Sequence, residues 1–178
     1  MKFAYKAFGI LVLGVLSTAV VYPVLHETGH CIMAIITGAK ITQIGLFPLP
    51  YVACEMQSGN NVCQMVTGMG GLLFPVALST LLKPRIFWLW YVVFAIKLTN
   101  VYALIYSMIS VFLYTRGIAV SKDDIAQLLM MFPEKILYIL IAIFAVLALE
   151  IVIIFKEKPL LKCMVFFEKC GKKTGANA

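Results

Sequence analysis

Apolar residues fall in four long stretches that polar segments separate. The stretches cover residues 7–37, 64–82, 86–114 and 136–155. A helix needs about 20 apolar residues to cross the hydrocarbon core of a bilayer, so each stretch predicts a membrane-spanning helix. The pattern therefore predicts an all-α polytopic membrane protein with about four transmembrane helices.

Two of these stretches are longer than one upright span. The first follows a lysine-containing N-terminal segment, as in a signal peptide, but it continues well past the roughly 7–15 residues of a signal-peptide core. It therefore predicts an uncleaved helix with a kink at Pro23. The third has about 29 residues and would be about 43 Å long as one helix, against a hydrocarbon core of about 30 Å. It predicts either one tilted helix or two shorter helices.

The segment between the first two helices has a different pattern. Residues 41–47 and 51–56 resemble two strands, and Pro48-Leu49-Pro50 separates them. Such runs bounded by proline predict a small β-hairpin-like loop at the membrane surface. After the third stretch, residues 116–135 predict a polar loop or a short helix.

Composition and charge agree with a membrane protein. Hydrophobic residues make up 62% of the 178 residues and charged residues 13%, whereas soluble domains carry about 25% charged residues. The net charge of +7 lies mostly in flanks of the apolar stretches, so no nucleic-acid partner is expected. Cytoplasmic N- and C-termini would put most of these flanks on one side, in line with the positive-inside rule. The cations of that side are Lys2, Lys6, Lys83, Arg85 and the lysines of residues 156–178.

The five cysteines do not predict a structural zinc site, because no two of them form a CxxC pair. Cys54 and Cys63 share one loop. They form a disulfide if that loop faces an oxidising compartment. Otherwise they remain thiols, which is the default expectation for all five.

The candidate chemistry concentrates in His26-Glu27-Thr28-Gly29-His30, which holds the only two histidines. Histidines four residues apart share one helix face, so both imidazoles can reach a single Zn²⁺. Glu27 then lies beside the metal as the base for its bound water. The alternative is that these are polar residues buried in a helix bundle. Each would cost about 2–3 kcal/mol on insertion unless it is paired or hydrated, and a structural role does not easily justify that sum.

A catalytic zinc site needs a third protein ligand, and with no other histidine a carboxylate is expected. The candidates are Glu55, Asp123, Asp124, Glu134 and Glu150. The histidines lie toward the outer end of the first helix, whereas Glu150 lies near the inner end of the last helix. The two aspartates follow the third span on the same side as the histidines. Depth in the membrane therefore favours Asp123 or Asp124.

The HETGH motif on an apolar helix, the strand-like loop after it and the later run Ser-Lys-Asp-Asp-Ile-Ala-Gln-Leu at residues 121–128 resemble the site-2 protease family of intramembrane zinc metalloproteases. The resemblance covers roughly residues 10–130. It implies that His26, His30 and a distal aspartate bind zinc. It also implies that Glu27 activates water.

The distal part of the resemblance suggests further site residues. In the smaller bacterial-type relatives the zinc-binding aspartate often precedes Ala-x-Leu, as Asp124 does here, so Asp124 is favoured over Asp123. An isoleucine follows Asp124 where the family usually has glycine. Asn100 resembles the asparagine that precedes the aspartate motif, which implies a substrate-binding role. The alternative for Asn100 is a helix–helix hydrogen bond.

These expectations combine into a function. Residues 1–155 are expected to form a membrane-embedded metallopeptidase domain, and residues 156–178 a basic juxtamembrane tail. Zn²⁺ is the expected cofactor. The expected partners are the lipid bilayer, a membrane-protein or peptide substrate that pairs with the strand-like loop, and an unidentified regulatory membrane partner. Two alternatives are a membrane metal-ion transporter and a catalytically silent adaptor with a zinc-stabilised fold.

One glycine-rich run has two interpretations. Gly68, Gly70 and Gly71 lie in the second apolar stretch. They either allow close backbone approach beside the metal site or serve ordinary small-residue helix packing.

Overall fold

The computed structural model describes residues 2–46, 48–55, 61–118 and 124–175, most of which are helical. The elements are, in chain order, α1 (Lys2–Leu16), η1 (Ser17–Val21), α2 (Tyr22–Thr37), β1 (Lys40–Gly45), β2 (Tyr51–Glu55), α3 (Asn61–Leu81), α4 (Phe87–Thr115), α5 (Asp124–Met131), η2 (Pro133–Lys135), α6 (Ile136–Lys156) and α7 (Pro159–Gly175). Four helical stretches are long and apolar enough to cross a membrane, namely Ala4–Thr37, Asn61–Leu81, Phe87–Thr115 and Pro133–Glu168. The predicted fold, four spans with a small β-hairpin between the first two, is confirmed.

The first span is one long rod made of α1, η1 and α2. A proline ring inside a regular helix clashes with the carbonyl four residues earlier. Directly before Pro23 the helix widens into a π-helical segment, Ser17–Val21, and then continues to Thr37. A π-helical turn thus stands where the sequence predicts a kink. The HETGH motif lies on the second half of this rod.

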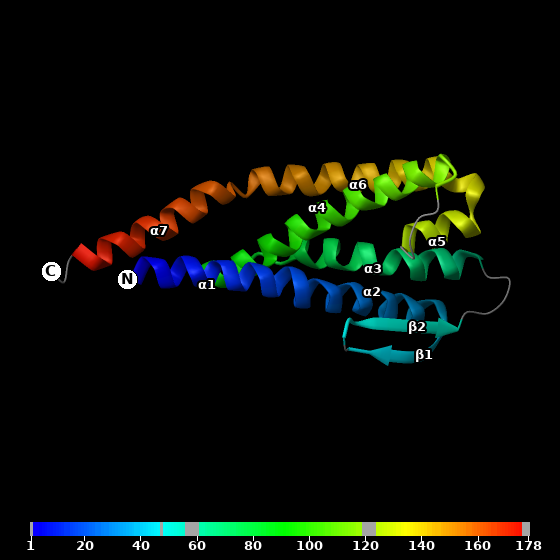
Figure 1. The fold of residues 1–178 in the computed structure, drawn as a ribbon, viewed down its shortest axis with the longest axis horizontal. Helices are drawn as coiled ribbons and strands as arrows, with labels where there is room; N and C mark the ends of the chain where they lie inside the picture. Colours follow the sequence, from blue (N-terminus) through cyan, green and yellow to red (C-terminus); the bar gives the residue numbers. More distant parts are fainter. Residues whose placement is uncertain (1, 47, 56–60, 119–123, 176–178) are drawn as a thin grey trace.

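The third span is a single helix of 29 residues, α4. Figure 1 shows α4 running obliquely between α3 and α6. A helix of this length measures about 43 Å, so a tilt shortens its extent across a hydrocarbon core of about 30 Å. Of the two sequence-based interpretations, one tilted helix is the one that the structure has.

Strands β1 and β2 form a two-stranded antiparallel sheet beside α2 (Figure 1). The register pairs Ile44 with Val52 and Gly45 with Tyr51. Across the strands, the Gln43 amide nitrogen donates to the Tyr51 hydroxyl at 2.5 Å. The sheet brings β2 next to the HETGH motif of α2.

Helices α2 and α3 pack backbone against backbone. A methyl group on Gly70 would lie 2.6 Å from the carbonyl oxygen of Gly29 and 2.7 Å from Cγ of Met33. Only glycine at both positions permits this approach, which is typical of helix packing in membranes. The crossing sets the second half of the first span directly against α3.

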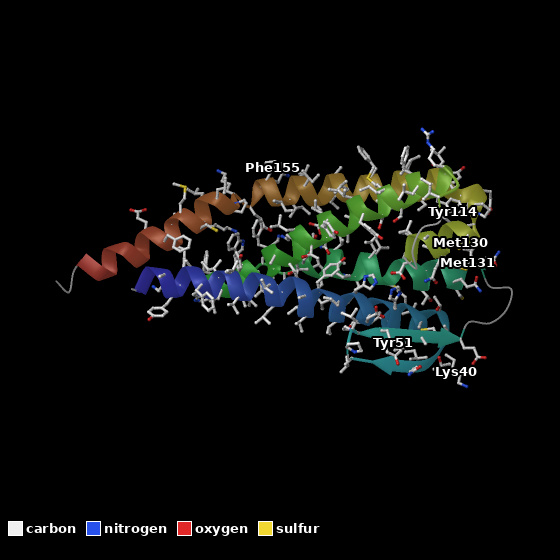
Figure 2. All side chains as sticks on the ribbon, viewed as in Figure 1. Lys40, Tyr51, Tyr114, Met130, Met131 and Phe155 are labelled. Carbon is white, nitrogen blue, oxygen red and sulfur yellow. The ribbon has the colours of Figure 1, made fainter. Side chains whose placement is uncertain are left out.

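Apolar side chains cover the outside of the bundle as well as its core. Figure 2 shows Phe155 projecting outward from α6, and its side chain is 77% exposed. In contrast, Lys97, Asn100 and Glu150 are at most 1% exposed. Exposed apolar groups around buried polar ones are expected of a protein whose solvent is lipid. The apolar core has the residues Leu72, Leu104, Val111, Ile125, Leu128, Leu129, Phe132, Ile139 and Ile143.

The basic tail begins as a helix. Helix α6 ends at Lys156, Lys158 takes a left-handed backbone conformation with φ of 49°, and α7 then runs in a new direction. Figure 1 shows the end of α7 and the start of α1 at the same end of the molecule, away from the β-hairpin.

Candidate metal centre

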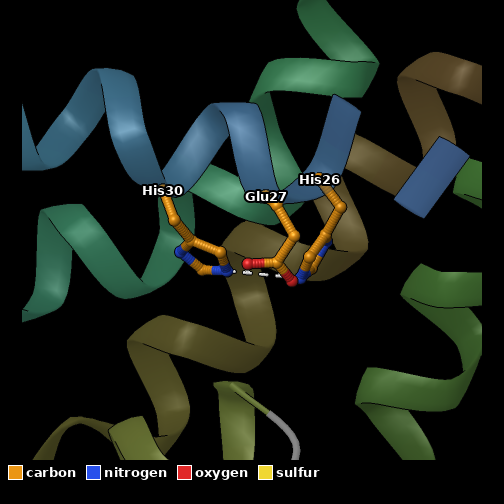
Figure 3. A group of neighbouring side chains, drawn as sticks. All are labelled: His26, Glu27 and His30. Carbon is orange, nitrogen blue, oxygen red and sulfur yellow. Dashed lines mark hydrogen bonds between the residues drawn. The ribbon is translucent and has the colours of Figure 1, made fainter. Parts of the chain in front are cut away.

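His26, Glu27 and His30 converge at one point beside α2. Histidines four residues apart share one helix face, and Figure 3 shows the three side chains projecting to the same side of the helix. The Nε2 atoms of the two histidines are 3.2 Å apart. One ligand atom from each of the three residues lies within 4.8 Å of the other two. The sequence prediction of a shared site for the three side chains is consistent with this geometry.

Asp124, the first residue of α5, completes the group. Its Oδ2 atom lies 2.9 Å from Nε2 of His26 and 3.2 Å from Nε2 of His30. The three atoms thus form a nearly equilateral triangle. Ligand atoms around a tetrahedral zinc ion, at bond lengths of about 2.0–2.1 Å, are about 3.3 Å apart, so this spacing fits such an ion. We call His26, His30 and Asp124 the histidine–aspartate cluster.

The other carboxylates proposed from the sequence lie elsewhere or are not described. Asp123, the alternative ligand, falls outside the described residues. Among the residues that the structure describes, no ion pair joins Glu55, Glu134 or Glu150 to either histidine. Asp124 is therefore the carboxylate that the fold brings to the histidines, and the apolar residues of α5 that are buried against α3 and α4 hold it there.

Hydrogen bonds fix the orientation of His30 and the charge of Asp124. Nδ1 of His30 donates to the backbone carbonyl of Thr67 at 2.8 Å, and because a carbonyl only accepts, the neutral imidazole presents the lone pair of Nε2 to the cluster. Burial alone would raise the pKa of the Asp124 carboxyl. In the metal-free protein, hydrogen bonds from His26 and His30, which require a proton on each Nε2, hold that pKa well below its usual range. Asp124 is thus an anion at every physiological pH.

Glu27 lies beside the cluster and is held by the β-hairpin. Its carboxylate accepts a hydrogen bond from the backbone of Val52 in β2. Figure 1 shows β2 between β1 and α2, so the edge of β2 that faces away from β1 lies toward the helix that carries Glu27. The sequence predicted the hairpin but not this contact, because a backbone donor leaves no mark on residue identity.

Two cavities reach the cluster from different sides. One, of about 260 Å³, holds Glu27 together with residues of β2 and α3. The other, of about 280 Å³, contains His26 and is lined largely by α4. Asp124 contributes to both. The side chains of His26, His30 and Asp124 keep 25%, 12% and 28% of their surface exposed, so small molecules can reach the cluster.

Gly71 leaves room for the two imidazoles. A methyl group there would lie 2.7 Å and 2.8 Å from Cε1 and Nε2 of His26, and would overlap Nε2 of His30. Both interpretations of the glycine-rich run therefore hold at different positions. Gly70 serves packing against α2, and Gly71 serves clearance beside the histidines.

Asn100 belongs to a different group in the middle of the bundle. Its amide nitrogen donates to Oε1 of Glu150 at 2.9 Å and to Oγ of Ser79 at 3.0 Å. These three residues, which we call the mid-bundle polar cluster, join α3, α4 and α6. The helix–helix hydrogen bond weighed for Asn100 is therefore present. A substrate-binding role stays a prediction.

Cys54 and Cys63 form no disulfide. Both are thiols, and Sγ of Cys63 donates to the carbonyl oxygen of Thr37 at 3.4 Å. Burial raises the pKa of the Cys54 thiol, and the neighbouring Cys31 and Glu27 add to the shift. The default expectation of thiols holds for these two residues.

The geometry joins the features that a hydrolytic metal site needs: three ligand atoms around one point, a carboxylate beside them and access from two cavities. Comparisons of the chain with protein-family models, with curated proteins and with solved structures find no match.

Proposed function

We propose that the chain is an intramembrane zinc metallopeptidase of the site-2 protease type. One observation carries the proposal. Two imidazole nitrogens and one carboxylate oxygen lie 2.9–3.2 Å from one another. Neutral imidazole nitrogens present lone pairs, and lone pairs brought so close require a positive charge among them. A proton or a metal ion can supply that charge, and the donor set of two histidines and one carboxylate is that of many catalytic zinc sites.

Zinc bound by this cluster would lower the pKa of a coordinated water toward neutrality and polarise the carbonyl of a peptide bond. The chain's own residues would do the rest. The Glu27 carboxylate takes a proton from water and later delivers it to the nitrogen of the leaving amine. The backbone of Val52 holds that carboxylate in place. The carbonyl of Thr67 keeps His30 in the tautomer that leaves Nε2 available.

The expected substrate is a membrane-protein segment or a peptide in extended form. A transmembrane helix has its carbonyls in internal hydrogen bonds and must unwind before a nucleophile can attack them. Among the residues that the structure describes, no further strand pairs with the edge of β2 beside Glu27. An extended segment can add to such an edge as a further strand. The cavity that holds Glu27 lies along this edge and has room for the reacting bond.

The orientation in the membrane is part of the proposal. The start of α1 and the end of α7 lie at the same end of the molecule (Figure 1), as four spans require. The excess of lysine in both flanks favours a cytoplasmic location for both termini. A reporter fused to either terminus is expected to be active in the cytoplasm.

The test combines metal content with turnover for the purified protein in detergent. Wild type is expected to hold about one zinc per chain, in line with a single site of three ligands. His26→Ala should lose the zinc and all hydrolysis. Glu27→Gln should keep the zinc and lose hydrolysis, measured on a peptide library by mass spectrometry.

Two other outcomes would identify the alternatives. Zinc uptake into proteoliposomes by wild type, without cleavage of any peptide, would indicate a transporter. A bound zinc with neither flux nor cleavage would indicate an adaptor. Absence of zinc, iron and cobalt from folded wild-type protein would refute the metal site itself.

A further inference from the structure

A groove of about 440 Å³ lies between the start of α4 and α7. Figure 1 shows these two segments at the end of the molecule away from the β-hairpin. Its walls are mostly apolar. The rings of Phe87 and Phe166 stack across it, with centroids 3.7 Å apart and an interplanar angle of 6°. Leu161 and Val165 extend the apolar wall along α7. The groove is thus built by packing between two helices that are far apart in the sequence.

Two cations line the same groove. Arg85 lies in the turn before α4 and Lys162 in the first turns of α7, and both side chains are exposed. Nζ of Lys162 lies over the ring of Trp90, 4.7 Å from its centroid. Among the described residues, no carboxylate forms an ion pair with Arg85 or Lys162. Both cations are therefore available to an anion.

An acidic residue that precedes α7 already has partners. Glu157, at the break between α6 and α7, forms an ion pair with Lys97 and accepts a hydrogen bond from the indole nitrogen of Trp90 at 3.2 Å. Its charge is neutralised by Lys97 rather than by the cations of the groove. The mouth of the groove thus carries positive charge with no carboxylate among its lining residues.

Two breaks in the helices mark this region as a membrane surface. Non-helical backbone does not face lipid inside the hydrocarbon core, because its polar groups would lack partners. The turn between α3 and α4, at residues 82–86, and the break between α6 and α7, at residues 157–158, therefore lie near the headgroups. Arg85 belongs to the first break, and Lys162 follows the second by one turn.

We propose that this groove binds one anionic phospholipid. The phosphate lies between Arg85 and Lys162, and an acyl chain lies along the apolar wall of α7. Guanidinium and ammonium groups are the usual partners of phosphate, and basic pockets between membrane helices bind anionic headgroups. A free phosphate would leave the apolar wall empty, whereas a phospholipid matches both halves of the groove. This site is separate from the histidine–aspartate cluster and does not depend on the proposed hydrolysis.

Trp90 provides a probe inside the groove. The chain has two tryptophans, and Trp88→Phe leaves Trp90, which is 5% exposed. This single-tryptophan protein is reconstituted in phosphatidylcholine vesicles that contain a minority of phosphatidylglycerol, and the acyl chains of one lipid or the other are brominated to quench fluorescence. Brominated phosphatidylglycerol should quench Trp90 as if enriched about tenfold over its share of the lipid, the effect expected of two basic side chains near a headgroup.

A matched pair of variants separates a site from general attraction. Arg85→Gln with Lys162→Gln should abolish the enrichment. Lys83→Gln with Lys156→Gln removes the same charge from the same two flanks, outside the groove, and should preserve it. Equal loss in both double variants, or no enrichment in the starting protein, would overturn the proposal. Displacement of the lipid by millimolar inorganic phosphate would overturn it as well, since the groove would then be a phosphate site.

Discussion

Two groups of polar side chains lie among the apolar helices, and they differ in access. The histidine–aspartate cluster keeps 12–28% of each side chain exposed and adjoins two cavities. The mid-bundle polar cluster is at most 1% exposed. Both groups contain a carboxylate and nitrogen atoms within hydrogen-bonding distance, so composition alone does not distinguish them.

The difference lies in what their polar atoms face. In the mid-bundle polar cluster a single amide nitrogen of Asn100 donates to both neighbours, and the group ties three helices together. In the histidine–aspartate cluster the basic nitrogens and the carboxylate face one another around a shared point. Placing polar groups inside a membrane protein costs free energy. One group offsets that cost by joining helices, whereas the other presents an open set of ligand atoms.

The largest effect is expected from Gly71→Ala, which would disrupt the histidine–aspartate cluster and leave the mid-bundle polar cluster intact. The added methyl group overlaps Nε2 of His30 and lies 2.8 Å from Nε2 of His26. We expect zinc affinity to fall about 100-fold, the upper range for disturbed ligand orientation, and hydrolysis to fall with it. Zinc content after dialysis against graded chelator measures the change.

Gly68→Ala is the matched control on the same helix. A methyl group there would lie 3.2 Å from Cδ2 of Leu128, which can shift by a few tenths of an ångström. Zinc content should stay at the wild-type level. Equal zinc loss in both variants would mean that α3 does not tolerate an added methyl group at either position. It would refute a specific role of Gly71 in leaving room for the imidazoles.

Val52→Pro should separate metal binding from turnover at the histidine–aspartate cluster. Proline has no N–H, so the hydrogen bond to Glu27 is lost, whereas the edge position of β2 tolerates proline without loss of the pairing to β1. We expect zinc to remain and kcat to fall about 10–100-fold, since a positioned general base contributes about 10²–10⁴-fold. Val52→Ala keeps the backbone donor and should retain wild-type kcat. Unchanged turnover in the proline variant would refute a role of β2 in holding Glu27.

The contrast between the two groups also shows what the sequence can predict. The spacing of His26, Glu27 and His30 was enough to predict that they share a site, because an interval of four residues puts two side chains on one helix face. Asp124 is 94 residues from His30, and spacing could not choose it over its neighbour. The order of the spans favoured the two aspartates over Glu150, and only the family resemblance favoured Asp124 over Asp123.

Other features depend on tertiary packing that no local pattern encodes. The hydropathy of the third stretch fits one helix or two equally well, and only packing against α3 and α6 selects the tilted α4. Gly71 and Val52 act through a missing methyl group and a backbone donor. Neither residue type marks a site by itself, so the sequence left both interpretations of the glycines open and did not predict the contact between Val52 and Glu27.

Glu150→Leu tests the opposite side of the comparison. The change removes one of the two acceptors of the Asn100 amide in the mid-bundle polar cluster, and the buried N–H that loses its partner costs about 1–2 kcal/mol of unfolding free energy. Glu150→Gln keeps an acceptor oxygen and should cost less. Unfolding in graded denaturing detergent measures the difference, and zinc content and turnover should be unchanged in both variants. Loss of hydrolysis in the Glu150→Gln variant with zinc still bound would indicate that the mid-bundle polar cluster has a functional role.

The smallest effect is a pH dependence of the metal-free protein that comes from Asp124. Hydrogen bonds from the histidines hold its folded pKa below the unfolded value of about 3.9. The stability that this carboxylate contributes is therefore fully present above about pH 4 and is lost as the pH falls toward the folded pKa. Wild type treated with chelator should unfold at a higher temperature than Asp124→Asn at pH 7 and pH 5. The corresponding difference in unfolding free energy should be about 1 kcal/mol or less, as for a partly exposed pair. The difference should become smaller at pH 3, as the pH approaches the folded pKa of Asp124. Equal unfolding temperatures of the two proteins already at pH 5 would mean that the Asp124 carboxylate is not paired with the histidines. Asp124 would then not belong to the histidine–aspartate cluster.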